Sequence, residues 1–408
     1  MTRRLHILLA AILFTGITPV TAYAASHKGE AFFYRIGEWV DNFQLRGLDT
    51  AYIGLPEHSW HLALTNGEVG IHNMYTTWVD PGTPVSLLSQ TTPGIELGFN
   101  VGYRGYGGGY SWDLYNAYTT HWNLSLGSKY IGIEFIRNVS TNLTGKFLVN
   151  GAEDPNLPML NKGEFRIANT SLTAWYALNS AHYSHNAAIK QSYIQKRTAG
   201  SLLLSVAYKT SEFSVLDSAK YIKDEDVISL VDGVTGMITR QVAVGIGYGI
   251  NYTPNHGVVL LHAAANMQVV CYSVNHISYV VPSDVYLPGE PQFVLRPAAP
   301  VYITGNMRAA ISWEINRWVH LSAGVKAQHL RFASKAGDLS TLAIKNWHWQ
   351  AHLNIGVRFG AGKKRVRQVL DEQLETPETP ETNALSPEPE KKSKMPKWIT
   401  DFFFSASH

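Results

Sequence analysis

The stretch WHWQAHLNIGVRF, residues 347–359, shows a strict two-residue alternation. Its odd positions, from Trp347 to Phe359, carry only apolar or aromatic side chains, and its even positions carry polar residues and one glycine. Successive side chains of a β-strand point to opposite faces of the sheet. One face of this strand is therefore uncharged and has aromatic residues at both ends. This pattern is typical of a transmembrane β-barrel, whose outer face meets lipid and whose inner face meets water.

Eleven earlier segments repeat this alternation and are predicted to be strands. They lie at about 60–78, 95–103, 106–114, 122–126, 131–135, 165–178, 201–208, 241–251, 259–269, 301–314 and 319–328. In the first of them the alternation changes phase at Asn66 and Gly67, which predicts a β-bulge there. The sequence thus predicts an all-β, antiparallel, up-and-down transmembrane β-barrel. Twelve strands are expected, with ten or fourteen as the neighbouring counts.

The connections between these segments alternate in length. Long connections follow the first, fifth, seventh, ninth and eleventh strands, at 80–93, 140–163, 211–236, 272–299 and 333–341. Short connections follow the second, fourth, eighth and tenth strands, which predicts long extracellular loops and short periplasmic turns. Two connections do not fit. The link after the third strand is short, and 179–200 is long for a turn, so it is a strand extension, a plug-like insertion or a sign that the strand count is wrong by two.

The chain ends predict export and a periplasmic location for both termini. Residues 1–24 combine Arg3 and Arg4, a short apolar run and a small-residue cleavage site, which indicates a cleaved signal peptide. Within 28–56, apolar residues at helical spacing from Lys28 to Phe43 predict a periplasmic amphipathic helix before a linker. The barrel is expected over 58–360. A Glu-, Pro- and Thr-rich composition predicts a flexible periplasmic tail over 361–408.

Composition excludes several classes of function. The single cysteine, Cys271, rules out an intramolecular disulfide and a cysteine-rich metal site. The net charge of +3 gives no indication of nucleic-acid binding. No cofactor motif and no catalytic motif is found, so we expect no cofactor and no enzymatic activity. The exception to weigh is His-x-Ser at His182, His276 and His320, because a base and a nucleophile two residues apart on one strand face could form a lipid hydrolase.

Alternation also predicts which charged and histidine side chains line the lumen. The predicted lumen-lining residues are Glu96, Arg104, Arg308, Glu314, His320, Lys326, His348, His352 and Arg358. Opposite charges in a narrow bore are expected to pair across it. The inward histidines, with His262 among them, could be interpreted as a metal site, but they lie on different strands and we favour a polar network without metal.

Three segments resemble a family of Bacteroidota outer-membrane proteins catalogued as domain of unknown function number 4421. They are Gly47 to Ile53, Gly102 to Tyr106, and Gln195 to Ser201. The resemblance covers most of residues 30–360 and implies an outer-membrane location, but it brings no known activity and no catalytic residues. The tail beyond Phe359 departs from a barrel that ends on an aromatic strand.

The sequence therefore leaves three hypotheses for function. The first is a narrow channel or a barrel that binds a small solute. The second is a structural or anchoring barrel whose tail meets a periplasmic partner, and the third is the His-x-Ser hydrolase. The other expected partners are outer-membrane lipid and the barrel-assembly machinery, and no nucleic acid is expected.

Overall fold

The computed structural model describes one closed β-barrel. It covers residues 47–58, 60–80, 83–92, 94–114, 119–128, 130–155, 157, 159–216, 234–254, 258–279, 292–295, 297, 302–333 and 342–360. The predicted signal peptide, the helix at 28–43 and the tail at 361–408 lie outside the described residues. No described helix is long and apolar enough to cross a membrane.

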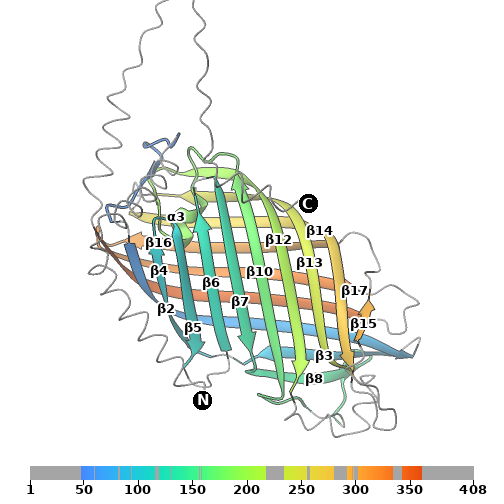
Figure 1. Cartoon of the computed structure of the whole chain (residues 1–408). Coiled ribbons are helices and arrows are strands. Elements are labelled where there is room, and N and C mark those ends of the chain that lie inside the picture. Colours follow the sequence, from blue (N-terminus) through green and yellow to red (C-terminus); the bar gives the residue numbers. More distant parts are fainter. Residues whose placement is uncertain are drawn as a thin grey trace, which may run out of the picture. The chain divides into compact units, whose positions relative to one another are not determined.

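Twelve antiparallel strands form the wall of the barrel (Figure 1). They are β2 (Trp60–Asp80), β4 (Glu96–Tyr103), β5 (Tyr106–Asp113), β6 (Thr119–Gly127), β7 (Ile131–Ser140), β10 (Phe165–Ala177), β12 (Ala199–Val215), β13 (Val234–Tyr252), β14 (Val259–Tyr279), β16 (Tyr302–Glu314), β17 (Val319–Ala333) and β18 (Leu342–Phe359). Each pairs with the next in this order, and β18 closes the ring by pairing with β2. The predicted architecture and the count of twelve are confirmed.

The outer face has the pattern that lipid requires. Every second residue points outward, and a band of the exposed side chains is aliphatic, as at Leu353 and Ile355. Exposed aromatic rings lie on both sides of this band; examples are Trp60, Tyr176, Tyr252, Trp313 and Phe359 on one side, and Trp122, Tyr208, Tyr272, Trp347 and Trp349 on the other. An apolar band between two aromatic girdles is the outer surface of a transmembrane barrel.

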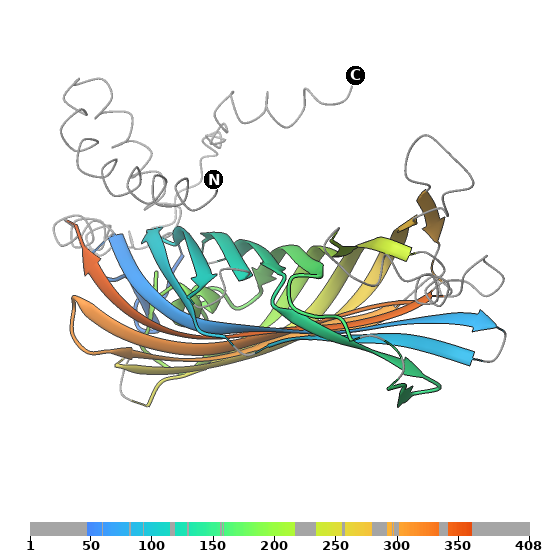
Figure 2. The same ribbon diagram turned by 90° about the horizontal axis from the view of Figure 1, so that it is seen from below.

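The two ends of the barrel differ. We call the end with the short connections, where Trp60 pairs with Phe359, the turn end, and the opposite end the loop end. At the loop end, β3 (Thr83–Thr91) pairs with β2 and with β8 (Leu143–Val149), and β8 pairs with β9 (Ala152–Glu153). β2, β3 and β8 extend past the ends of β5 and β6 (Figure 2). β3 and β8 pair with each other beyond the loop-end ends of β5 and β6. This pairing explains why the link after the third predicted strand is short.

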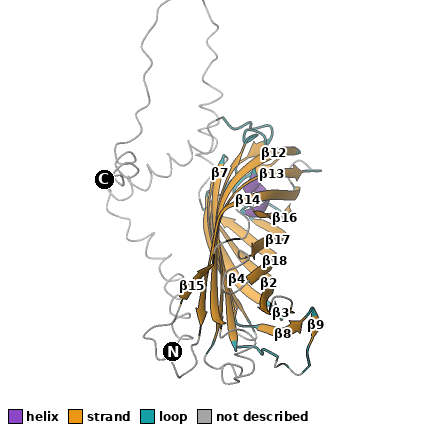
Figure 3. Cartoon of the chain, turned by 90° about the vertical axis from the view of Figure 1, so that its right-hand side faces the viewer, coloured by secondary structure: helices purple, strands orange, loops and turns teal. Residues whose placement is uncertain are grey.

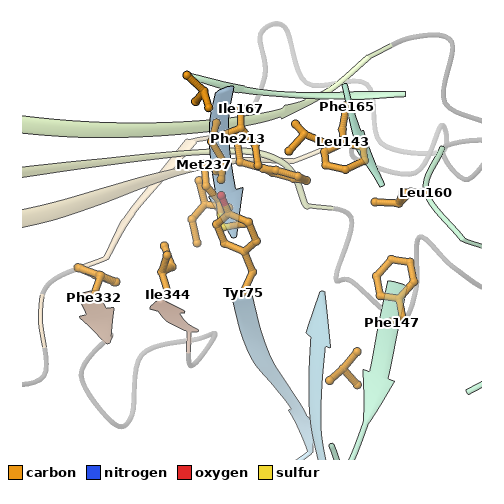
Figure 4. Packing of buried hydrophobic residues seen from close by; sticks show 14 residues of the cluster. Tyr75, Leu143, Phe147, Leu160, Phe165, Ile167, Phe213, Met237, Phe332 and Ile344 are labelled. Carbon is orange, nitrogen blue, oxygen red and sulfur yellow. The ribbon is translucent and has the colours of Figure 1, made fainter. Parts of the chain in front are cut away.

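A cluster of apolar side chains fills the lumen near the loop end, and we call it the loop-end cluster (Figure 4). Its inward members from the barrel wall are Val69, Ile71, Tyr75, Phe165, Ile167, Phe213, Met237, Ile277, Phe332 and Ile344, all at most 6 % exposed. Phe147 of β8 and Leu160 add to it. Interiors of this kind are close-packed and exclude water.

The predicted bulge at Asn66 and Gly67 is wrong. The pairing of β2 with β18 and with β4 runs through these residues without a register shift. The phase of the apolar residues changes for another reason. Near the turn end the apolar residues of β2, such as Leu64, face outward, whereas nearer the loop end Ile71 and Tyr75 face inward and join the loop-end cluster. A bulge does occur in β14, where Cys271 is the extra residue opposite β13 and is exposed.

The two faces of β18 give a first testable prediction. Leu353 is half exposed on the outer face, and its neighbour Asn354 points inward and donates a hydrogen bond to Ser322 Oγ. A lysine facing hydrocarbon near the midplane costs about 2–4 kcal/mol. Leu353→Lys should therefore impair folding into lipid far more than Asn354→Lys, as measured by heat-modifiable migration in a gel. Equal losses for the two variants would contradict the face assignment.

The orientation of the barrel gives a second prediction. Ala152 lies at the loop end and Arg317 lies in a turn at the turn end, and both are exposed. In a Cys271→Ser background, Ala152→Cys should react with an impermeant maleimide on intact cells, because long loops face outward in such barrels. Arg317→Cys should react only after the outer membrane has been breached. Labelling of Arg317→Cys on intact cells would reverse the orientation.

Candidate functional site: a polar chamber in the lumen

A cavity of about 90 Å³ lies in the middle of the lumen, and we call it the central chamber. Its polar lining comes from eight strands, β2, β4, β5, β6, β7, β16, β17 and β18, and from the segment after β10. The lining includes Asn100, His121, Asn123, Glu134, Lys190, Arg308, Lys326, Gln350, His352 and Asn354. A water molecule needs about 10–15 Å³ by a comparable measure, so the chamber has room for roughly six waters or one small solute.

Glu134 is the centre of an ion cluster that spans the chamber. Its Oε2 accepts hydrogen bonds from Arg308 Nη2 at 2.8 Å and from Lys326 Nζ at 2.6 Å. Glu134 is on β7, whereas its two partners are on β16 and β17, which lie on the opposite side of the ring of strands. All three side chains are at most 15 % exposed. The pairs therefore cross the bore and narrow it.

Polar contacts narrow the bore between the chamber and the loop-end cluster. Asn138 of β7 hydrogen-bonds to His348 of β18 and to His121 of β6. Closer to the loop end, Asn346 Nδ2 of β18 donates a hydrogen bond to Asn169 Oδ1 of β10 at 3.1 Å. β18 and β10 are on opposite sides of the barrel, so these side chains link its walls. At this level hydrogen-bonded polar groups narrow the lumen.

The connection 178–198 enters the barrel from the turn end, and we call it the plug. It contains a short helix, α3 (His185–Ile189), which contacts β13, β14 and β16 (Figure 3). Several hydrogen bonds hold the plug to the barrel. Asn186 Nδ2 donates to Ser128 O at 3.1 Å, Gln191 Nε2 donates to Ser312 Oγ at 3.0 Å, and Asn251 Nδ2 donates to Ser184 O at 2.8 Å. Of the three interpretations of this connection, the plug-like insertion is the one observed.

The N-terminal segment 47–58 packs on the plug. Its β1 (Ile53–Gly54) pairs with β11 (Ile194–Gln195) of the plug, and Asp49 lies 3.2 Å from the Nε2 of His182. Ile53 is fully buried against Tyr193 and the alanines of α3. Two of the three segments that carry the family resemblance, at 47–53 and 195–201, thus meet at this junction.

Glycines in the wall make space for the plug at two positions. A Cβ atom at Gly249 of β13 would lie 2.1 Å from the Oη of Tyr183, and one at Gly127 of β6 would lie 2.3 Å from the Nδ2 of Asn186. Any larger residue would collide with the plug. Inward glycines therefore do not leave an open path here, because plug side chains occupy the space.

Lys190 follows α3 and brings a third cation to the chamber. Within the described residues its Nζ forms no hydrogen bond and no ion pair. Burial lowers the pKa of its ammonium, the nearby Arg308 guanidinium lowers it further, and Glu134 opposes the change. The chamber thus holds three cations and one carboxylate.

The residues predicted to line the lumen have different surroundings. Arg308, Lys326 and His352 line the central chamber. Arg358 forms a bidentate pair with Glu314 next to the plug, and its Nη2 also donates to Gln191 O at 3.3 Å. Two residues that line the chamber were not predicted from the sequence. Glu134 could have been predicted, because it alternates with the apolar residues of β7. Lys190 could not, because it lies outside the strands.

The remaining predicted residues do not line the chamber. Glu96 is buried on β4 and accepts a hydrogen bond from Ser111 Oγ at 2.8 Å. His320 is buried near the turn end, where its ring faces that of His61, and His348 belongs to the Asn138 network. The prediction for Arg104 is wrong. Arg104 has a φ of 50° in the turn after β4, and its guanidinium lies over the outward ring of Tyr103.

No metal site and no hydrolytic pair is formed by the described residues. They contain no group of three or more potential metal ligands. Of the three His-x-Ser motifs, His182 contacts Asp49 and Asn179 rather than Ser184, and Ser322 Oγ accepts its hydrogen bond from Asn354. No hydrogen bond joins the histidine to the serine within any of the three motifs over this part of the chain.

The Glu134 cluster gives a third prediction. Glu134→Gln leaves two buried cations without their counter-charge, and breaking a buried pair costs about 3–5 kcal/mol. The midpoint of denaturant-induced unfolding of the purified barrel should fall accordingly. The matched control is Glu153→Gln, because Glu153 pairs with Lys146 on the surface, where a pair contributes at most about 1 kcal/mol. Equal small shifts for both variants would contradict a structural role for the cluster.

Three solved structures of bacterial outer-membrane and transport proteins are similar to this chain over about three quarters of its length. The outer membrane protease OmpT from Escherichia coli is 8 % identical, with a TM-score of 0.37 over 74 % of this chain and 97 % of that one. The outer membrane protein OprG from Pseudomonas aeruginosa is 12 % identical, with a TM-score of 0.26 over 74 % and 98 %. The Pseudomonas putida toluene transporter TodX is 7 % identical, with a TM-score of 0.22 over 74 % and 90 %. These likenesses are too loose to support a statement about activity.

No curated protein matches the sequence. The sequence profile of one family matches residues 48–359, which is the whole of the barrel together with the N-terminal segment that packs on the plug. With its closed antiparallel wall and apolar outer band, the chain is a transmembrane β-barrel of the outer-membrane type, and it belongs to the family described as Domain of unknown function (DUF4421).

Proposed function

We propose that this protein is an outer-membrane barrel that binds a small polar solute in its lumen and passes it when the plug moves. The observation that carries the proposal is the central chamber, which is polar and lies between two separate seals. A barrel that served only as a wall could fill its centre with apolar side chains. Here the apolar filling lies at the loop end and around the plug, and buried charges are kept in the middle although burying them is costly.

The two seals differ in how they can open. The loop-end cluster is apolar, so opening it exposes large side chains such as Phe213 and Phe332 to water. The plug is held to the wall by hydrogen bonds, such as those of Asn186, Gln191 and Asn251, and by two smaller apolar clusters around Tyr183 and Tyr193. Each such bond contributes only about 0.5–1.5 kcal/mol, because water replaces it when it breaks. The apolar clusters around the plug are also smaller than the loop-end cluster, so we take the plug as the seal that opens.

A structural or anchoring role is the second candidate, and the pairing across the bore supports it. The bonds of Glu134 and Asn138 tie opposite walls together and favour a barrel that conducts little at rest. In this role the C-terminal tail would meet a periplasmic partner. Deletion of 361–408 would then cause a cell-envelope defect without changing solute passage. Membrane lipid and the barrel-assembly machinery would be partners in either role.

The hydrolase hypothesis has the least support. Its best-placed motif is His320 with Ser322 on β17, and both side chains are buried on the inner face of the barrel. A lipid hydrolase needs its nucleophile to face lipid. We therefore propose a protein without enzymatic activity.

The fourth prediction tests the two seals. The wild-type protein should be nearly silent in a planar bilayer. Replacing 184–192 by a Gly-Ser segment of equal length removes α3 and the contacts of Asn186 and Gln191, so small discrete conductance steps should appear. Combining this change with Phe213→Ala and Phe332→Ala should enlarge the steps, because both seals are then weakened.

The matched control keeps the plug and carries only the two phenylalanine substitutions, and it should stay nearly silent. Heat-modifiable migration must show first that each variant is folded. If the folded variants all stay silent at every voltage, the lumen is not a path and the structural role is favoured.

A further inference from the structure

We infer that the solute of the central chamber is a small oxyanion, of the phosphate, sulfate or short carboxylate class. This inference rests on the proposed function and names the chemistry that the chamber would recognise. Its starting point is the balance of charge around the cavity. Lys190, Arg308 and Lys326 oppose the single carboxylate of Glu134, so the lining carries an excess of two positive charges.

The donors of this lining are only partly used. Arg308 offers five N–H donors, and within the described residues only its Nη2 is engaged, with Glu134 Oε2. Lys326 binds the same oxygen. The Nζ of Lys190 forms no hydrogen bond in this part of the chain although it lines the cavity. Guanidinium and ammonium groups bind oxyanions through short, charge-assisted hydrogen bonds.

The neutral groups of the chamber suit the same ligand. The amide groups of Asn100, Asn123, Gln350 and Asn354 lie around the cavity and can donate hydrogen bonds to anionic oxygens. A volume of about 90 Å³ admits a small polyatomic anion. A cation of the same size would meet three like charges, and an apolar molecule would leave the buried polar groups unpaired.

A second cavity lies beyond the chamber toward the loop end. It measures about 20 Å³, shares Ile136 with the lining of the chamber, and is bordered by Lys209, Asn138, Asn169 and His348. Lys209 is only 4 % exposed, and its Nζ has no hydrogen-bond partner among the described residues. A buried ammonium without a partner is costly, and an anion relieves that cost. The second cavity has room for about one water, so Lys209 adds positive charge beside the central chamber and does not form a separate anion site.

The plug gives this site a means of release. Lys190 is part of the plug, whereas Arg308 and Lys326 belong to the wall. When the plug leaves the lumen, it takes one of the three cations away from the anion. The affinity of the chamber therefore falls at the step that opens the turn end, which favours release to the periplasmic side.

The fifth prediction tests the class of ligand on the full chain, purified in detergent at low salt. Equilibrium dialysis with radiolabelled inorganic phosphate should show saturable binding near one per chain, and unlabelled sulfate should compete. Lys190→Met should weaken the binding roughly tenfold or more, because a charge-assisted hydrogen bond is lost. Lys190→Arg should retain most of it. Lys190 is the chosen position because its substitution breaks no ion pair among the described residues and should leave the barrel folded.

The matched control is Lys162→Met, which removes an exposed lysine at the loop end and should leave phosphate binding unchanged. Equal losses in the Lys190→Met and Lys162→Met variants, or no saturable binding of phosphate, sulfate or acetate, would overturn the inference. Binding of an uncharged solute in place of these anions would overturn it while leaving the proposed function intact. Anion binding by a barrel that never conducts would preserve the site and overturn the function as a conduit.

Discussion

Closure of the sheet between β2 and β18 is the constraint on which the rest of the structure depends. Every residue of β18 is paired with a residue of β2, from Leu342 with Thr77 to Phe359 with Trp60. In lipid no water is available to satisfy an open strand edge, so a spanning sheet must close on itself. Closing twelve strands also sets the bore, which is wider than that of an eight-stranded barrel filled by its own side chains. The plug, the loop-end cluster and the pairs that cross the bore all occupy space that this closure creates.

The part of the fold that lies in lipid could be predicted from the sequence, and the part beyond it could not. Within the membrane an outward residue must be apolar, so strands such as β16 and β18 can be recognised from the alternation of their residues. Toward the loop end that requirement disappears and the inner face becomes apolar, as at Phe213, Met237 and Ile277. The alternation then continues, but the apolar residues now face inward and the polar residues face outward. For this reason β12, β13 and β14 extend farther than their lipid-facing patterns indicated.

The chamber could be predicted only in its chemistry. Alternation correctly indicates that Arg308 and Lys326 point inward, but it contains no information on which strand lies opposite. Glu134, their common partner, is 174 residues from one and 192 from the other. Lys190 is less predictable still, because the plug has no periodic pattern and its position depends on packing against β1 and the wall. Arg104 shows the opposite error, because it was predicted to line the lumen and does not. It follows the last residue of β4, where the chain turns and the alternation no longer determines the direction of a side chain.

The plug also decides what the lumen can hold. With the plug in place, its Tyr183 and Asn186 fit against Gly249 and Gly127, and Lys190 completes a chamber of three cations and one carboxylate. Without it, two cations and one carboxylate would face a wider bore, and the wall glycines would line open space. The same glycines that let the plug enter would then let solutes pass. The packing of the plug and the electrostatics of the chamber therefore change together, because a single short segment supplies both the steric block and the third positive charge.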